Sequence, residues 1–195
     1  MVRNFPQEMI TFVRMKTTGQ IRRIFLIGYM GAGKTTLGKA LSRQMNLSFI
    51  DTDHFIEEHY HQTIRRIFEE KGEDGFREIE RKTLREVSEF EDAVISTGGG
   101  TPCFHGNMAF MNMAGTTVYL KLSVDEIVKR TEPCRDTRPV LKNRSGEELR
   151  QYIAASLSER SRYYEQADIV LPVDTVNTGA DTNVLITRLE KMLFP

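Results

Sequence analysis

The sequence has few cysteines, no excess of either charge and no long apolar run, and each of these excludes a class of protein. The two cysteines, Cys103 and Cys134, are too few and too unpatterned for a disulfide scaffold or a zinc cluster, so we expect reduced thiols. The 27 basic and 27 acidic residues give a formal net charge of zero, which offers no global attraction to nucleic acid or to an anionic membrane. No window approaches the roughly 18 consecutive apolar residues of a membrane-spanning helix.

The first residues also lack the apolar core and the small-residue cleavage site of a secretion signal. We therefore expect a cytoplasmic protein. Residues 1–20 are expected to form a loosely held leader. Residues 21–195 are expected to form one domain, because a chain of 195 residues is long enough to bury a single substantial core.

Short, β-rich apolar runs alternate with segments of helical spacing, which is typical of an α/β fold with a parallel sheet covered by helices on both faces. We expect strands within residues 23–28, 47–51, 93–97, 116–122 and 167–173. The last helix is expected at about residues 181–193. Its predicted buried residues are Val184, Leu185, Leu189 and Met192.

The stretch between the second and third apolar runs, residues 52–92, is too long for one crossover helix of ordinary length. Its apolar spacing predicts two or three helices. Such an insertion lies at the carboxyl ends of the strands, where open α/β sheets bind ligands. We therefore expect it to bind a substrate.

Residues 28–35, "GYMGAGKT", match the pattern G-x-x-x-x-G-K-[ST] between an apolar run and a helical segment. Backbone N–H groups and the positive end of the following helix form a site for phosphate groups. In such a loop Lys34 reaches the β- and γ-phosphates and the hydroxyl of Thr35 binds Mg²⁺. The alternative is an ordinary glycine-rich turn. The predicted ATP-binding residues of the loop are Met30, Gly31, Ala32, Gly33, Lys34, Thr35 and Thr36.

Two carboxylates, Asp51 and Asp53, follow the second apolar run. In an extended chain they face the same side, where like charges repel unless a cation, a lysine or a ligand hydroxyl joins them. In a doubly wound sheet this strand end lies near the phosphate loop, so one carboxylate is predicted to support Mg²⁺ through water and the other to accept a hydrogen bond from a substrate hydroxyl. Alternatively the pair only caps the helix that begins near His54, a role that suits Asp53.

Three glycines and two arginines are further candidates. Gly98, Gly99 and Gly100 follow the third run, where a backbone without side chains approaches a ligand closely; a plain flexible turn is the alternative. Arg77 lies in the first turn of a predicted helix, where a cation opposes the helix dipole, so either an anionic partner or plain solvation explains it. Arg160 lies on the inward face of its helix and needs a carboxylate or phosphate unless it extends to solvent.

A basic segment, "CRDTRPVLKNRS", separates two predicted helices. We predict a mobile lid over about residues 132–145 that brings Arg138 onto the transferring phosphate. An ordinary solvated loop is the alternative.

The ordered motifs "GYMGAGKT", "DTD", "FREIE", "STGGG", "TRPVL" and "ERSRYY" resemble those of the shikimate kinases over about residues 22–193. The resemblance implies a P-loop, nucleoside monophosphate kinase-like fold: a three-layer sandwich with a five-stranded parallel sheet, a helical substrate-binding insertion and a lid. It implies transfer of the γ-phosphoryl group of ATP, with Mg²⁺, to the 3-hydroxyl of shikimate in chorismate and aromatic amino-acid biosynthesis. It also implies a monomer that binds ATP and shikimate and neither nucleic acid nor membrane.

The resemblance also assigns roles to individual residues. The implied catalytic residues are Asp53, Lys34 and Arg138. The implied substrate-binding residues are Asp53, Arg77, Gly98, Gly99, Gly100 and Arg160. Outside the phosphate loop, the implied ATP-binding residues are Arg130 and Arg138. The implied metal-binding residues are Thr35 and, through water, Asp51.

Two other functions stay open at this point. One is a P-loop kinase of another small hydroxy acid such as gluconate, against which the combination of Asp53, Arg77 and Arg160 argues. The other is a nucleotide-dependent switch or ATPase, which calls for a base-specificity motif or a basic surface; the neutral composition offers neither. One segment departs from the family pattern, because "VDTVNTGAD" lacks the arginine that the family often has near adenine.

Overall fold

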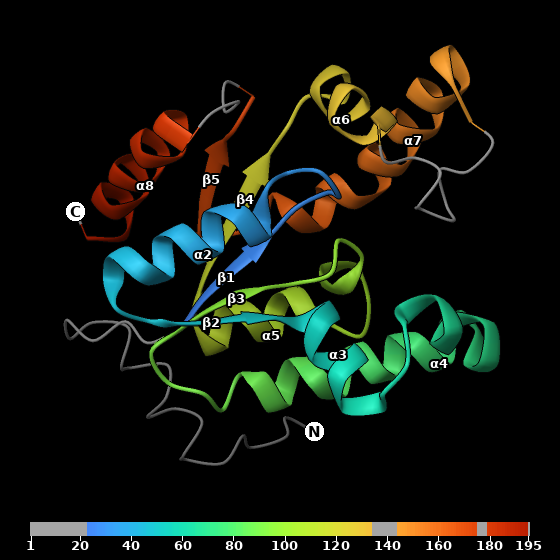
Figure 1. The fold of residues 1–195 in the computed structure, drawn as a ribbon, viewed down its shortest axis with the longest axis horizontal. Helices are drawn as coiled ribbons and strands as arrows, with labels where there is room; N and C mark the ends of the chain where they lie inside the picture. The colour runs from blue at the N-terminus through green and yellow to red at the C-terminus, as the bar shows by residue number, and fades with distance from the viewer. Residues whose placement is uncertain (1–22, 134–143, 175–178, 195) are drawn as a thin grey trace, which may run out of the picture.

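Five parallel strands form one sheet at the centre of the molecule (Figure 1). The structure, a computed structural model, describes residues 23–133, 144–174 and 179–194. The strands are β1 (Arg23–Ile27), β2 (Ser48–Asp51), β3 (Ala93–Ser96), β4 (Thr116–Lys121) and β5 (Ile169–Pro172), in the spatial order β2-β3-β1-β4-β5. Each predicted apolar run contains one of these strands. The five-stranded parallel sheet expected from the sequence is therefore confirmed.

Helices cover both faces of the sheet, as expected (Figure 1). They are α2 (Lys34–Met45), α3 (Thr52–Tyr60), α4 (Ile64–Val87), the 3₁₀ helix η2 (Thr101–Cys103), α5 (Asn107–Ala114), α6 (Val124–Thr131), α7 (Gly146–Tyr164) and α8 (Gly179–Leu193). On one face, α2, α6, α7 and α8 pack against Leu26 and Val118. On the other, α4 and α5 pack against Phe25 and Ile95. Within the described ranges, no helix has both the length and the apolarity needed to cross a membrane.

Three strands end at the same level of the sheet. Asp51 of β2 pairs in register with Ser96 of β3, and Ser96 pairs in register with Leu26 of β1. The loops that follow these strands therefore leave the sheet side by side. They carry the phosphate-loop motif, the two aspartates and the three glycines, so the register brings the predicted site residues to one place.

The segment between β2 and β3 consists of α3 and α4, which extend beyond the carboxyl end of β2 (Figure 1). Gly72, with φ of 68° and ψ of −175°, divides α4 into two helical segments. Ile56, Ile67 and Phe76 form a small apolar cluster of their own. The last turns of α4 instead pack on the sheet and belong to its core.

The last helix, α8, agrees with the sequence in extent but not in all its buried residues. Leu185 and Leu189 are buried, as predicted, whereas Val184 is 70% exposed and Met192 is 38% exposed. Ile186 is buried instead. A helical pattern this rich in apolar residues admits two adjacent stripes, and only packing against the neighbouring elements selects one of them.

Leu189→Ala is expected to lower the free energy of unfolding by about 2–5 kcal/mol, because it removes a buried side chain and leaves a cavity. Val184→Ala is the matched control on the same helix and is expected to change it by less than about 0.5 kcal/mol. Urea denaturation followed by circular dichroism measures both values. Equal losses in the two variants would contradict the placement of α8.

Candidate active site

The phosphate loop joins β1 to α2. Gly33 stands at the N-cap of α2 with φ of 86°, a left-handed conformation that glycine adopts without strain. The ammonium group of Lys34 folds back over the loop, where Nζ donates hydrogen bonds to the carbonyl oxygens of Gly28 at 2.9 Å and Tyr29 at 3.1 Å. The loop therefore presents a cation beside the positive end of a helix, which is the combination that binds phosphate.

Asp51 connects the phosphate loop to α3. Its Oδ2 accepts a hydrogen bond of 2.8 Å from the hydroxyl of Thr35. Its Oδ1 accepts the backbone N–H groups of Asp53 at 3.2 Å and His54 at 3.5 Å, so Asp51 is the N-cap of α3. The alternative that gave the cap to Asp53 is wrong, because the helix begins at Thr52 and places Asp53 in its first turn.

Asp53 is the second carboxylate of the pair. Its pKa is raised from 3.8 to about 6, first because the group is buried and then because Asp51 and Glu80 repel its charge; Lys34 partly opposes this shift. A carboxylate with such a pKa is ionised at neutral pH yet more basic than an ordinary aspartate. This combination suits a general base.

The three glycines form the centre of the site. A Cβ atom at Gly98 would lie 2.8 Å from Asp53 Oδ1, one at Gly99 would lie 3.7 Å from Arg160 Nη1, and one at Gly100 would lie 2.7 Å from Arg77 Nη1. Each glycine therefore faces one of the three charged groups that the sequence singled out. The loop also lies against the phosphate loop, since a Cβ at Gly99 would lie 3.4 Å from the carbonyl oxygen of Gly28.

Hydrogen bonds from other elements hold this glycine loop. The N–H of Gly98 donates to the hydroxyl of Thr52 at 3.1 Å, which gives the threonine of "DTD" a structural role. The carbonyl oxygen of Gly99 accepts a short hydrogen bond from the hydroxyl of Tyr164 on α7. The loop is thus fixed in position relative to Asp53 on one side and α7 on the other.

Arg77 has carboxylate and aromatic neighbours. Its Nη1 donates to Glu80 Oε2 at 2.6 Å, and its guanidinium lies 4.1 Å from the centre of the Phe104 ring. Glu80 is buried and accepts a second hydrogen bond of 2.6 Å from the hydroxyl of Thr101. These contacts fix the plane of the guanidinium next to the glycine loop.

Arg160 and Arg130 both contact the phosphate loop. The guanidinium of Arg160 stacks 5.2 Å from the centre of the Tyr29 ring. Arg130 donates to Glu126 at 2.8 Å, to the carbonyl of Val173 at 3.1 Å and to that of Gly31 at 3.5 Å. Arg130 therefore joins the phosphate loop to the end of β5.

The structure brings together most of the predicted site residues. They are the phosphate loop with Lys34, Thr35, Asp51, Asp53, Arg77, Gly98, Gly99, Gly100, Arg130 and Arg160. Arg138, Cys134 and most of the predicted lid, 132–145, lie outside the described residues. Sequence reasoning missed Glu80, Tyr29 and Tyr164. Only Glu80 had a local signal, because it lies three residues after Arg77 on one helix, a spacing that favours an ion pair.

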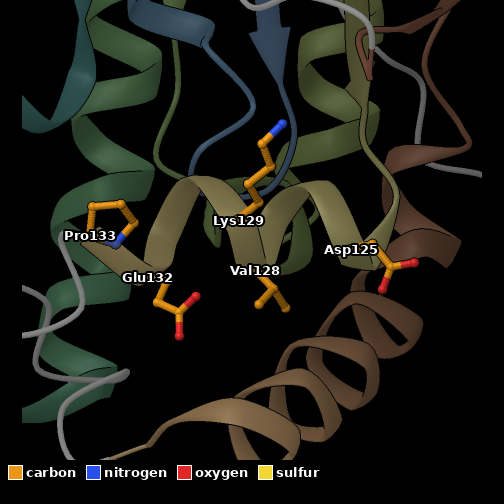
Figure 2. Close-up of a pocket in the computed structure, with 5 residues that line it drawn as sticks. All are labelled: Asp125, Val128, Lys129, Glu132 and Pro133. Carbon is orange, nitrogen blue, oxygen red and sulfur yellow. The ribbon is translucent and has the colours of Figure 1, made fainter.

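A surface pocket of about 480 Å³ lies along α6, the helix that also carries Arg130 (Figure 2). Its lining residues are Asp125, Val128, Lys129, Glu132 and Pro133. Figure 2 shows Asp125, Val128 and Glu132 on one side of α6 and Lys129 pointing to the other side. None of the predicted site residues lines this pocket, so the candidate active site stays at the strand ends.

Comparisons with known proteins find relatives of this chain in one family. The family model of the shikimate kinases matches residues 30–190. The shikimate kinase of Parabacteroides distasonis is 56% identical over 173 residues, 89% of this chain and 100% of that protein. The solved shikimate kinase of Bacteroides thetaiotaomicron has a TM-score of 0.82 and 46% identity over 88% of this chain and 97% of its own. The shikimate kinase of Acinetobacter baumannii, solved in complex with shikimate, has a TM-score of 0.77 and 34% sequence identity. The match covers 93% of this chain and 97% of that one.

The fold and the site define a class of protein, the ATP-dependent P-loop phosphotransferases. The phosphate loop follows the central strand of a parallel sheet, and a carboxylate and two arginines face the neighbouring loop. Several families share that class. The match over residues 30–190 and the identity of 56% single out one of them. The chain belongs to the shikimate kinase family.

Asp53→Asn is expected to stabilise the ligand-free protein at about pH 7.5 but not below about pH 4. Because folding raises the pKa of Asp53 from 3.8 to about 6, the folded state binds the proton more tightly, and stability falls as the pH rises through this range. Asparagine avoids this loss. Thermal unfolding, with a chelator present, should give the variant a higher Tm than the wild type at about pH 7.5. Below about pH 4 the Tm values of the two proteins should become equal. A variant that is less stable than the wild type at both pH values would contradict the assignment.

Proposed function

We propose that this chain transfers the γ-phosphoryl group of ATP to the 3-hydroxyl of shikimate, giving shikimate 3-phosphate and ADP. The observation that carries the proposal is that the three glycines, beside the phosphate loop, face one carboxylate and two guanidinium groups: Asp53, Arg77 and Arg160. A substrate with both a hydroxyl group and a carboxylate is complementary to that set. The relative from Acinetobacter baumannii, solved in complex with shikimate, supports the same acceptor.

The nucleotide side of the reaction is assigned to the phosphate loop. Its backbone N–H groups and Lys34 bind the phosphates of ATP. The hydroxyl of Thr35 and the carboxylate of Asp51, 2.8 Å apart, offer only oxygen atoms, the donors that Mg²⁺ prefers when it keeps several of its waters. These two residues would hold Mg²⁺, Asp51 through water. The bound ion would neutralise charge on the phosphates during transfer.

The acceptor is activated by Asp53. Its carboxylate accepts the proton of the 3-hydroxyl, or orients that hydroxyl, while the oxygen forms a bond to the γ-phosphorus. The bond between the γ-phosphorus and the β–γ bridging oxygen breaks, and ADP leaves. A pKa of about 6 keeps Asp53 ionised for this step near neutral pH. Lys34 stabilises the negative charge on the transferring group. The family resemblance assigns the same role to Arg138.

The two arginines of the site bind the carboxylate of the acceptor. Each guanidinium offers parallel N–H donors that match a carboxylate in geometry and charge. Arg77 comes from the segment 52–92, so we assign that segment to acceptor binding within a single kinase domain, 21–195. Arg130, which contacts the phosphate loop, is assigned to ATP. A monomeric state is proposed from the resemblance alone. A lid over 132–145 and a cytoplasmic location are proposed from the sequence.

The most direct test of the reaction is the rate of ADP release from MgATP with shikimate, with gluconate and with no acceptor. We expect release that depends on shikimate, because the family match and the relative solved with shikimate both support that acceptor. Asp53→Asn should abolish most of this release. Release with gluconate alone would favour a kinase of another hydroxy acid, and release without any acceptor would favour an ATPase or a nucleotide-dependent switch.

Arg160→Ala is expected to raise the KM for shikimate by about ten-fold or more, because a charge-assisted bidentate contact contributes roughly 1.5–3 kcal/mol. The KM for ATP should change by less than about two-fold. Arg162→Ala is the matched control two residues further along α7, where the side chain is exposed. Steady-state kinetics with each substrate varied in turn gives both constants. An equal rise in both constants would place the effect of Arg160 on the fold instead of the acceptor.

A further inference from the structure

Arg77 already binds two carboxylates of its own helix. Its Nη1 donates to Glu80 at 2.6 Å, while its Nε and Nη2 both donate to one oxygen of Glu73, at 3.3 Å and 3.0 Å. The Nε–Nη2 edge is one of the paired donor edges with which a guanidinium holds a carboxylate. An incoming carboxylate therefore finds this edge of Arg77 occupied.

The two glutamates differ in how firmly they are held. The side chain of Glu80 is 4% exposed and accepts a further hydrogen bond from Thr101. The side chain of Glu73 is 61% exposed, and Arg77 is its only hydrogen-bond or ion-pair partner among the described residues. The side chain of Arg77 is only 11% exposed, but Glu73 reaches it from solvent, and an ion pair with a solvated partner contributes little to stability. Glu73 can therefore leave the guanidinium for water at little cost, whereas Glu80 stays.

Orientation of Arg77 does not require Glu73. Glu80 fixes Nη1, and the Phe104 and Phe76 rings lie 4.1 Å and 5.5 Å from the guanidinium carbon. With both glutamates bound, one cation faces two anions, so the group as a whole is net negative toward an anionic acceptor. Release of Glu73 leaves a neutral pair and a free donor edge.

We propose that Glu73 is a further residue of the acceptor site: an internal carboxylate that occupies Arg77 and is displaced by the carboxylate of the acceptor. Gly72 breaks α4 immediately before Glu73, so the new helical segment places Glu73 one turn before Arg77, in reach of its guanidinium. Glu73 thus lowers the affinity of the site for its anionic acceptor. The inference rests on the proposed function, since it takes the acceptor to be shikimate.

The test is the dissociation constant of shikimate, measured by titration calorimetry on the full chain. Glu73→Gln and Glu73→Ala should each bind shikimate about two- to five-fold more tightly than the wild type, which corresponds to the range of a surface ion pair. The KM for ATP should stay unchanged in both. Glu69→Gln is the matched control, because Glu69 is equally exposed on the same helix and pairs with Arg65 instead.

Each outcome decides between the claims. Unchanged or weaker binding of shikimate by both Glu73 variants overturns the inference, and weaker binding would make Glu73 a residue that orients Arg77. A similar gain in Glu69→Gln also overturns it, because the effect would then come from the general charge of the helix. If the wild type and all variants fail to bind shikimate, the proposed function fails together with the inference.

Discussion

The carboxylate of Asp51 holds the two halves of the site together. One oxygen accepts the hydroxyl of Thr35 at the start of α2, and the other accepts the backbone N–H of Asp53 at the start of α3. The phosphate loop and the proposed base are therefore fixed to the same side chain. Because Asp51 ends a strand whose register is set by β3, the geometry of both halves depends on the pairing of the sheet. A slip in that register would move the acceptor side away from the phosphate loop.

A second set of contacts fixes the glycine loop and Arg77 on the acceptor side. Thr52 holds Gly98, Tyr164 holds Gly99, and Glu80 holds Arg77. The glycine loop is thereby fixed between groups of opposite charge, and its lack of side chains leaves them close to a common space. Groups held in this way stabilise developing charge without having to reorganise during the reaction, which is the main source of electrostatic catalysis. The raised pKa of Asp53 has a related origin: the group is buried in this fixed surrounding first, and the charges of Asp51 and Glu80 add to the effect.

The sequence predicts the components of this site better than the contacts between them. The strands and the phosphate loop follow from local patterns, since each strand end is fixed by its own apolar run. Contacts such as Tyr29 beneath Arg160 join segments far apart in the chain, and no local pattern contains them. The cap of α3 also required the structure, because it depends on whether the helix begins before or after Asp53. The role of Arg138 stays a prediction, as it lies outside the described residues.

The central claim is that one small acid binds between Asp53, Arg77 and Arg160 next to the phosphate loop. A crystal structure of the chain with shikimate and a non-hydrolysable ATP analogue tests it most directly. The account predicts the acceptor carboxylate on the two guanidinium groups, the 3-hydroxyl within hydrogen-bond distance of Asp53, and that hydroxyl pointing at the terminal phosphate. A carboxylate bound elsewhere, or a 3-hydroxyl turned away from Asp53, would contradict the account.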